Sequence, residues 1–362
     1  MRDATATLAA AQISSSRVPY FHFVFKRNIS DTEVADYSCS GAPLDNDARI
    51  LAYRIHEFPY SSGDSDSPSY VDLRNNDRAI VDLRGTYVDP GLGDVTGAGN
   101  EYCVLPRMWV KHQEEISSPG NLQVRIILEG WAEALDEEHA RANNEITDPS
   151  LYYLWDRTHT PYGIMAVILD PDVSYLPFTL DALTVDDGII DTFLPYFELN
   201  AERNRYESKL RILYSLINMT ACYIKPLAEN HLSIVYPQEE DAVDLTIYSN
   251  IPPWFYEFHE KKNEVLPNTI GVFCNNTDIT PEYVWPHLVI GWATDWDAYA
   301  RYGDIYIIGL HQAPTVLTQT DCSDRAYAIL AKNKAEESEA YLVMPSDCRQ
   351  ELYDRHKIYD YR

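Results

Sequence analysis

Apolar residues in this chain come mainly in short segments, and this spacing limits the secondary structure that they can form. Residues 20–26, 50–58 and 122–128 are aromatic, β-branched or alternate between apolar and polar side chains. Prolines and turn-forming residues separate many such segments. Alternation with a period of two buries one face of a strand and exposes the other. The first third of the chain is therefore predicted to be β structure.

Two further patterns also favour strands. The tetrapeptide Val-Asp-Leu-Arg occurs at residues 71–74 and again at residues 81–84, with the turn-forming residues 75–77 after the first copy. This arrangement predicts a hairpin of two paired strands. A continuous apolar run at residues 163–169 has the length of a strand and indicates a fully buried one.

Two segments show the pattern of helices instead. Across residues 200–224, apolar side chains recur every three or four positions, and Pro226 ends the pattern. That spacing predicts a long central amphipathic helix with one buried stripe. Residues 323–334 are rich in alanine and predict a second helix, and Asp321 or Ser323 is suited to cap its start.

The order of these segments predicts the fold class. Strands come first, helices dominate the middle and strands return at the end, so we expect an α+β protein with a mostly antiparallel sheet. A change of composition near residue 148 allows a division into a β-rich part, residues 1–148, and a part with helix and strands, residues 149–362. Because no flexible linker marks that boundary, we expect residues 1–362 to form one continuous unit.

The charge of the chain excludes several classes of partner. Asp and Glu total 56 against 29 for Lys and Arg in 362 residues, and the formal net charge is −27. A protein with this charge repels nucleic acid and anionic membrane surfaces at long range. We therefore expect neither membrane binding nor direct sequence-specific binding of nucleic acid. A basic protein is a partner that the charge would favour.

The sequence indicates no cofactor and no metal site. The six cysteines lie far apart, whereas zinc sites and secreted disulfide frameworks use short spacings. We therefore expect buried free thiols. The first residues lack the cationic start and long apolar stretch of a signal peptide. The predicted location is the cytoplasm, or a virion in the cytoplasm of a host cell, and not the secretory pathway.

Four residues are candidates for catalysis if the protein is an enzyme. Asp156 and His159 precede a turn and would form a general acid–base pair if they met in a cleft. Asp295 and Asp297 lie among aromatic residues, as the paired carboxylates of a glycoside hydrolase would. No nucleophile motif accompanies either pair, so the sequence favours a protein without catalytic residues and keeps a hydrolase as an alternative.

The segment around Asp295 also contains the candidates for a protein interface. Tyr and Trp are enriched at the buried centres of interfaces, and the chain has 27 tyrosines and seven tryptophans. The interface candidates are Trp285, Trp292, Trp296, Tyr299 and Tyr302. These residues predict that the chain associates with copies of itself.

Taken with the charge, the aromatic segments favour a structural protein that forms a homo-oligomer through Tyr- and Trp-rich surfaces. One such protein is a capsid-type shell subunit of a double-stranded RNA virus, because an acidic lining would not adhere to a genome that moves inside the shell. The first alternative is an acidic immunity or regulatory protein that binds a basic protein. The second is a hydrolase that uses Asp and His side chains.

Overall fold

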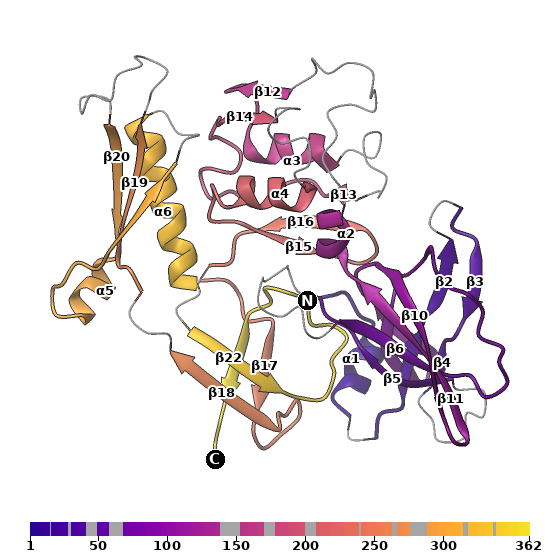
Figure 1. Cartoon of the computed structure of the whole chain (residues 1–362). Coiled ribbons are helices and arrows are strands. Elements are labelled where there is room, and N and C mark those ends of the chain that lie inside the picture. The colour runs from indigo at the N-terminus through magenta and orange to yellow at the C-terminus, as the bar shows by residue number, and fades with distance from the viewer. Residues whose placement is uncertain are drawn as a thin grey trace, which may run out of the picture.

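Figure 1 shows a computed structural model of the whole chain. It describes residues 1–14, 16–27, 30–40, 49–57, 68–137, 153–169, 178–199, 208–238, 240–262, 266–275, 288–313, 318–335 and 338–362. Within these ranges the chain forms 23 strands and six helices, with 40% strand and 20% helix. The protein is mostly β, so the predicted α+β class is wrong. The possible division at residue 148 stays a prediction.

The largest sheet has seven antiparallel strands in the order β3-β2-β7-β10-β11-β6-β5. Side chains such as Phe25, Leu73 and Ile126 are fully buried in the core that these strands share. Between β6 and β11, the Arg125 guanidinium donates two hydrogen bonds, of 2.7 and 2.8 Å, to the Asp72 carboxylate. The strands are β2 (Val24–Arg27), β3 (Glu33–Asp36), β5 (Ile50–Arg54), β6 (Ser69–Arg74), β7 (Thr86–Val88), β10 (Met108–Ser118) and β11 (Asn121–Glu129).

The repeated Val-Asp-Leu-Arg tetrapeptide does not form the predicted hairpin. Residues 71–74 belong to β6, which pairs with β5 and β11. Residues 81–84 lie outside the strands. Leu83 is nevertheless buried in the same core, and its N–H donates to the Gln113 side-chain oxygen at 2.9 Å. Leu83 of the second copy therefore contributes to the core, although this copy forms no strand.

A second antiparallel sheet of four strands has the order β4-β1-β8-β9, and helix α1 packs against β8. The Thr5 hydroxyl caps α1 by accepting a hydrogen bond from the Leu8 N–H at 3.1 Å. Leu8, Cys103 and Cys348 form a small buried core. The elements are α1 (Ala6–Gln12), β1 (Pro19–His22), β4 (Cys39–Ser40), β8 (Gly91–Thr96) and β9 (Gly99–Val104).

The largest buried core lies in the middle of the chain, among three helices and two small sheets. In Figure 1, α3 and α4 lie one above the other beside the sheet β13-β16-β15. Ile164, Leu213 and Leu232 are fully buried there. The elements are α2 (Trp131–Glu137), β12 (Tyr153–Asp156), α3 (Pro161–Leu169), β13 (Thr179–Leu180), β14 (Tyr196–Leu199), α4 (Lys209–Ile217), β15 (Tyr223–Pro226) and β16 (His231–Val235).

The predicted long central helix is wrong for residues 208–224, the part of the predicted range that the structure describes. Only α4, of nine residues, forms there. Beyond it, the Thr220 hydroxyl donates to the Ile217 carbonyl at 2.8 Å, and the Ala221 N–H donates to the Asp187 carboxylate at 2.6 Å. Because these side chains bond the next backbone groups, the helix stops, and β15 then pairs with β16.

The apolar run at residues 163–169 belongs to helix α3 and not to the predicted strand. Pro161 occupies the first position of this helix, where its missing N–H costs no hydrogen bond. The turns of α3 bury Ile164 and Ile168. A short, continuous apolar run suits a buried helix as well as a buried strand, so periodicity alone could not distinguish the two.

The last third of the chain contains a three-stranded sheet, β20-β19-β21, and two pairs of strands, β17 with β23 and β18 with β22. Helix α6 includes residues 323–334 of the second predicted helix but begins four residues earlier, at Gln319. The Thr318 hydroxyl accepts from the Asp321 N–H at 3.1 Å, and the Asp321 carboxylate accepts from the Thr318 N–H at 3.2 Å. The elements are β17 (Leu245–Tyr248), β18 (Glu257–Lys262), β19 (Thr269–Asn275), β20 (Leu288–Thr294), α5 (Trp296–Arg301), β21 (Ile308–Gln312), α6 (Gln319–Ala335), β22 (Ser338–Val343) and β23 (His356–Tyr359).

Among the residues that the structure describes, no helix is both long enough and apolar enough to span a membrane.

Candidate interaction surface

The sheet β20-β19-β21 has one face that α6 covers. Ile270 and Val272 of β19 are fully buried against Cys322 and Ala326 of α6. The helix lies very close to the sheet at Gly291 of β20, where an added Cβ would lie 2.2 Å from a backbone nitrogen of α6. Only glycine allows the helix to lie this close, so the sequence at this strand determines how α6 docks.

The other face of the sheet carries large apolar side chains in solvent. Trp292 of β20 and Leu310 of β21 both pair in register with Gly271 of the central strand β19. Their side chains meet over this glycine, where an added Cβ would lie 2.5 Å from Trp292 and 2.9 Å from Leu310. Trp292 is still 47% exposed and Leu310 61% exposed. Strand alternation directs them away from α6.

An aromatic cluster continues from the end of β20 into α5. The Asp295 carboxylate caps this helix by accepting hydrogen bonds from the N–H groups of Asp297 and Ala298, at 3.0 and 3.1 Å. The cap places Trp296 in the first helical turn, where it is 63% exposed. The Tyr299 and Tyr306 rings lie 4.5 Å apart between centroids, and the Trp296 ring lies 5.6 Å from Tyr299.

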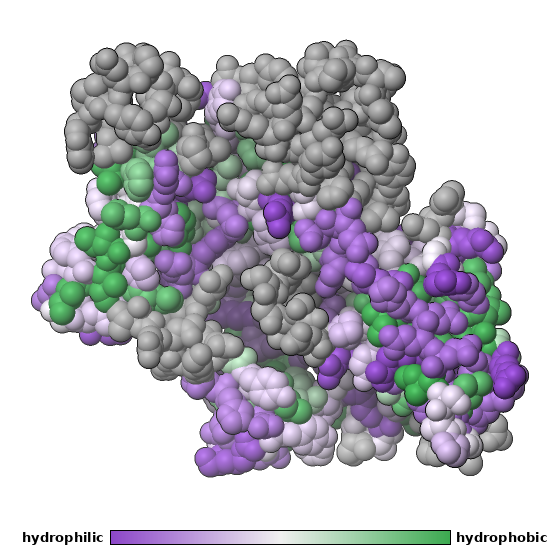
Figure 2. Space-filling model, viewed as in Figure 1, coloured by the Kyte–Doolittle hydropathy of each residue, from purple (hydrophilic) through white to green (hydrophobic). Residues whose placement is uncertain are grey.

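We use the term apolar face for the exposed large side chains of β20, α5, β21 and the segment leading into β21. They are Trp292, Trp296, Ile305, Tyr306, Ile308 and Leu310. Figure 2 shows hydrophobic residues gathered on this side of the molecule, at the left of the view. Exposed apolar side chains gathered on one side of a protein mark sites where proteins bind one another, because leaving them in water is unfavourable.

The structure brings three of the predicted interface residues to this part of the surface. Trp292 and Trp296 belong to the apolar face, and the half-buried Tyr299 packs beside it. Tyr302 lies instead beside a small cavity of about 20 Å³ that Leu330 of α6 also lines. Trp285 lies outside the described residues. Whether these residues form an interface stays a prediction.

Sequence reasoning missed the contribution of the segment before and within β21. The missed residues are Ile305, Tyr306, Ile308 and Leu310. The sequence contains a pattern that indicates a strand here, since Ile308 and Leu310 alternate with Gly309 and His311 as in a half-buried strand. Alternation gives two faces, but it does not tell which of them a helix covers.

The four catalytic candidates have ordinary structural surroundings where the structure describes them. Asp295 is used as the cap of α5, and Asp297 lies exposed in the first turn of that helix. His159 is exposed, and its Nδ1 lies 3.0 Å from the Thr158 hydroxyl. Asp156 ends β12, but its side chain lies outside the described part of the chain. None of these contacts joins Asp295 or Asp297 to a second carboxylate.

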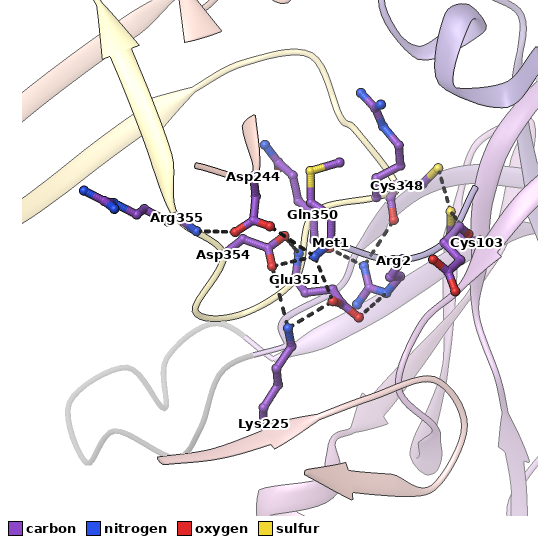
Figure 3. A network of polar contacts seen from close by, with 12 residues as sticks. Met1, Arg2, Cys103, Lys225, Asp244, Cys348, Gln350, Glu351, Asp354 and Arg355 are labelled. Carbon is purple, nitrogen blue, oxygen red and sulfur yellow. Dashed lines mark hydrogen bonds and ion pairs between the residues drawn. The ribbon is translucent and has the colours of Figure 1, made fainter. Parts of the chain in front are cut away.

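A concentration of charge lies where the first residue meets the C-terminal part of the chain, as Figure 3 shows. The Met1 amino nitrogen lies 3.0 Å from the Asp354 carboxylate and 3.4 Å from that of Glu351. The Lys225 ammonium of β15 lies 3.0 Å from Glu351 and 3.6 Å from Asp354. We call these four residues the terminal ion network.

The terminal ion network is well shielded from water. The side chains of Glu351 and Asp354 are only 10% and 3% exposed. Burial of the Met1 ammonium lowers its pKa, but the hydrogen bond to Asp354 and the charge of Glu351 outweigh this effect and raise the pKa overall. The network therefore holds β15, the first residue and the segment before β23 together.

Comparison with known proteins adds information on the fold. No protein-family model and no curated protein sequence matches this chain. The structure is similar to a tail protein from Neisseria meningitidis MC58, with a TM-score of 0.54 and 10% sequence identity over 94% of this chain and 86% of that chain. A 43 kDa tail protein of prophage MuSo2 from Shewanella oneidensis gives a TM-score of 0.49 and 12% identity, over 89% of this chain and 81% of that chain. The chain thus shares its overall fold with the tail protein from Neisseria meningitidis.

Proposed function

We propose that this protein is a structural subunit of a phage-type tail and that it assembles with copies of itself. The similarity to a tail protein extends over nearly the whole chain, and this supports a structural role in a virus-like particle. It lends no support to the shell of a double-stranded RNA virus. The acidic charge is compatible with a tail subunit, which has no need to hold nucleic acid on its surface.

The observation that carries the self-assembly in this proposal is the apolar face. Fully burying one large apolar side chain stabilises a protein by about 1.5–3 kcal/mol, and this chain leaves several such side chains in solvent on one side. Like-charged copies repel one another at long range, so contact between them depends on apolar burial at short range. Trp292, Trp296 and Leu310 supply that kind of contact.

The proposal is tested by measuring the molar mass of the purified protein by light scattering over a range of concentrations. We expect a discrete oligomer whose dissociation constant rises at least about 30-fold in the variant Leu310→Asp, because a central interface residue contributes about 2 kcal/mol or more. The control variant is Ile116→Ser, which removes an exposed apolar side chain of β10 outside the apolar face. This control should keep the oligomer of the unchanged protein.

The effect of salt separates the proposal from the immunity or regulatory alternative. Association through apolar contact should persist or strengthen when salt is added, because salt screens the repulsion between acidic copies. A monomer at every concentration would refute self-assembly. Salt-sensitive capture of a basic protein would then favour the immunity or regulatory alternative. An oligomer that Leu310→Asp leaves unchanged would show that the apolar face is not its interface.

A further inference from the structure

Two of the six buried cysteines lie next to each other. The sulfur atoms of Cys103 in β9 and Cys348 in the segment between β22 and β23 are 3.3 Å apart, although 245 positions separate the residues in the chain. Their exposed fractions are only 4% and 3%. Both thiols are free in this structure. Because the two sulfur atoms are already in contact, forming a bond between them needs only a small local movement.

The surroundings of Cys103 distinguish it from Cys222 and Cys322. The hydrogen bond from the Cys348 thiol lowers the pKa of Cys103, and the nearby guanidinium of Arg2 acts in the same direction. Burial instead raises the pKa of Cys222 to about 12 and that of Cys322 to about 11. A lower pKa gives a larger fraction of thiolate, which is the reactive form. Within the pair, Cys103 is therefore the thiol that more readily forms the thiolate.

We propose that Cys103 and Cys348 are a redox modification site, at which a reversible disulfide locks the C-terminal segment of the chain onto β9. The oxidant is a small-molecule disulfide. The Cys103 thiolate attacks one of its sulfur atoms, the sulfur–sulfur bond of the reagent breaks, and the first thiol leaves. Cys348 then loses its proton and attacks the Cys103 sulfur of the mixed disulfide, and the second thiol leaves. One disulfide replaces another: the two protein thiols are oxidised and the reagent is reduced.

The lock acts where the two ends of the chain already meet. The Cys348 N–H donates to the Gln12 side-chain oxygen at 3.0 Å, and the Cys348 carbonyl accepts from the Arg2 guanidinium at 3.2 Å. Glu351 and Asp354 of the terminal ion network follow a few residues later. In a reducing compartment these non-covalent contacts alone hold the segment. In an oxidising one, the covalent bond keeps it in place when they open.

Access to the buried sulfur atoms sets the rate of the reaction. A reagent reaches them only when the segment around Cys348 opens, because neither side chain is exposed in the closed structure. Oxidation of the folded protein should therefore be slow and should accelerate in moderate urea. Reduction of the locked form depends on the same opening.

The test uses the full-length protein incubated with oxidised glutathione. Six thiols should titrate in denaturant before the reaction and four after it, and peptide mapping without reductant should identify one Cys103–Cys348 crosslink. Amide hydrogen exchange across residues 344–362 should slow by about 30-fold or more in the oxidised form. The control variant Cys222→Ala should still form the crosslink.

Two further variants test the assignment of the nucleophile. Cys348→Ala should accumulate a stable glutathione adduct on Cys103, because no second thiol resolves it. Cys103→Ala should leave Cys348 unmodified under the same conditions. Six titratable thiols after incubation in moderate urea would overturn the proposal, and so would a crosslink between other cysteines. Circular dichroism shows whether each variant is folded. If a variant does not fold, the thiol count of the unchanged protein still tests whether the disulfide forms.

Discussion

Lys225 is the residue through which the terminal ion network can be tested most directly. Its ammonium lies 3.0 Å from Glu351 and 3.6 Å from Asp354, and its side chain is 12% exposed. At an effective dielectric constant of about 20, each contact contributes on the order of 5 kcal/mol of attraction, which desolvation of the ions largely offsets. The variant Lys225→Met keeps an aliphatic side chain and removes the charge, so the two carboxylates stay buried with one cation fewer.

The expected loss of stability depends on the charges that remain after the substitution. Removing one partner of a buried ion pair costs about 3–5 kcal/mol, because the other charge is left without compensation. The Met1 ammonium, 3.0 Å from Asp354, and the Arg2 guanidinium, 3.9 Å from Glu351, still compensate part of the acidic charge, so we expect the lower end, about 3 kcal/mol. Since about 1.4 kcal/mol corresponds to a factor of ten, amides in β23 should exchange about 100-fold faster with solvent.

Hydrogen exchange followed by mass spectrometry is the assay, read in peptides from residues 344–362. The control variant is Arg84→Met, which breaks an exposed ion pair with Asp82 and should leave exchange unchanged. In the Lys225→Met background, Glu351→Gln should recover part of the protection, because it removes the carboxylate that lay closest to the lost ammonium. An exchange rate within about threefold of the unchanged protein, with the fold retained, would refute the reasoning.

Two further predictions concern packing and pH. Gly291→Ala should destabilise the protein by about 1–3 kcal/mol or more, because the added Cβ would lie 2.2 Å from the Ser323 nitrogen of α6. Urea denaturation measures this loss. The control variant is Gly97→Ala, because a Cβ at Gly97 meets no atom within 4 Å. Burial raises the pKa of Asp94, although the charge of Arg17 acts against this effect. The folded state therefore binds a proton at Asp94 more readily than the unfolded state does. As the pH rises through the raised pKa, this contribution to the stability of the folded state is lost. The variant Asp94→Asn lacks this loss, and its stability relative to the unchanged protein should increase from pH 4 to 7; a difference that stays constant over this range would contradict the assignment.

The sequence alone could predict much of the strand content, because alternation leaves a local signal. It was less informative about helices. Residues 163–169 carry no periodicity that separates a strand from a helix, and the stripe across residues 200–224 continues past the point where the helix ends. There, the Asp187 carboxylate bonds the Ala221 N–H from another part of the chain. No local pattern encodes that contact.

The sequence also predicted only part of the candidate surface. The aromatic segment around α5 was visible in the sequence, as was the tendency of Trp and Tyr to occupy interfaces. The sequence did not show which face of β20 and β21 lies outward, because this depends on the docking of α6 at Gly291. Residues 71–74 and 81–84 have the same sequence but only the first copy is paired, since neighbouring strands and not the tetrapeptide determine the pairing.

Composition and local periodicity therefore determined the acidic charge, the short strands and the aromatic segment. Tertiary structure alone decided which residues distant in sequence became neighbours. Cys103 meets Cys348, and Met1 meets Asp354, across 245 and 353 positions of the chain. Contacts at such separation depend on the packing of the whole fold, because their cost in chain entropy is met by the burial of many other residues.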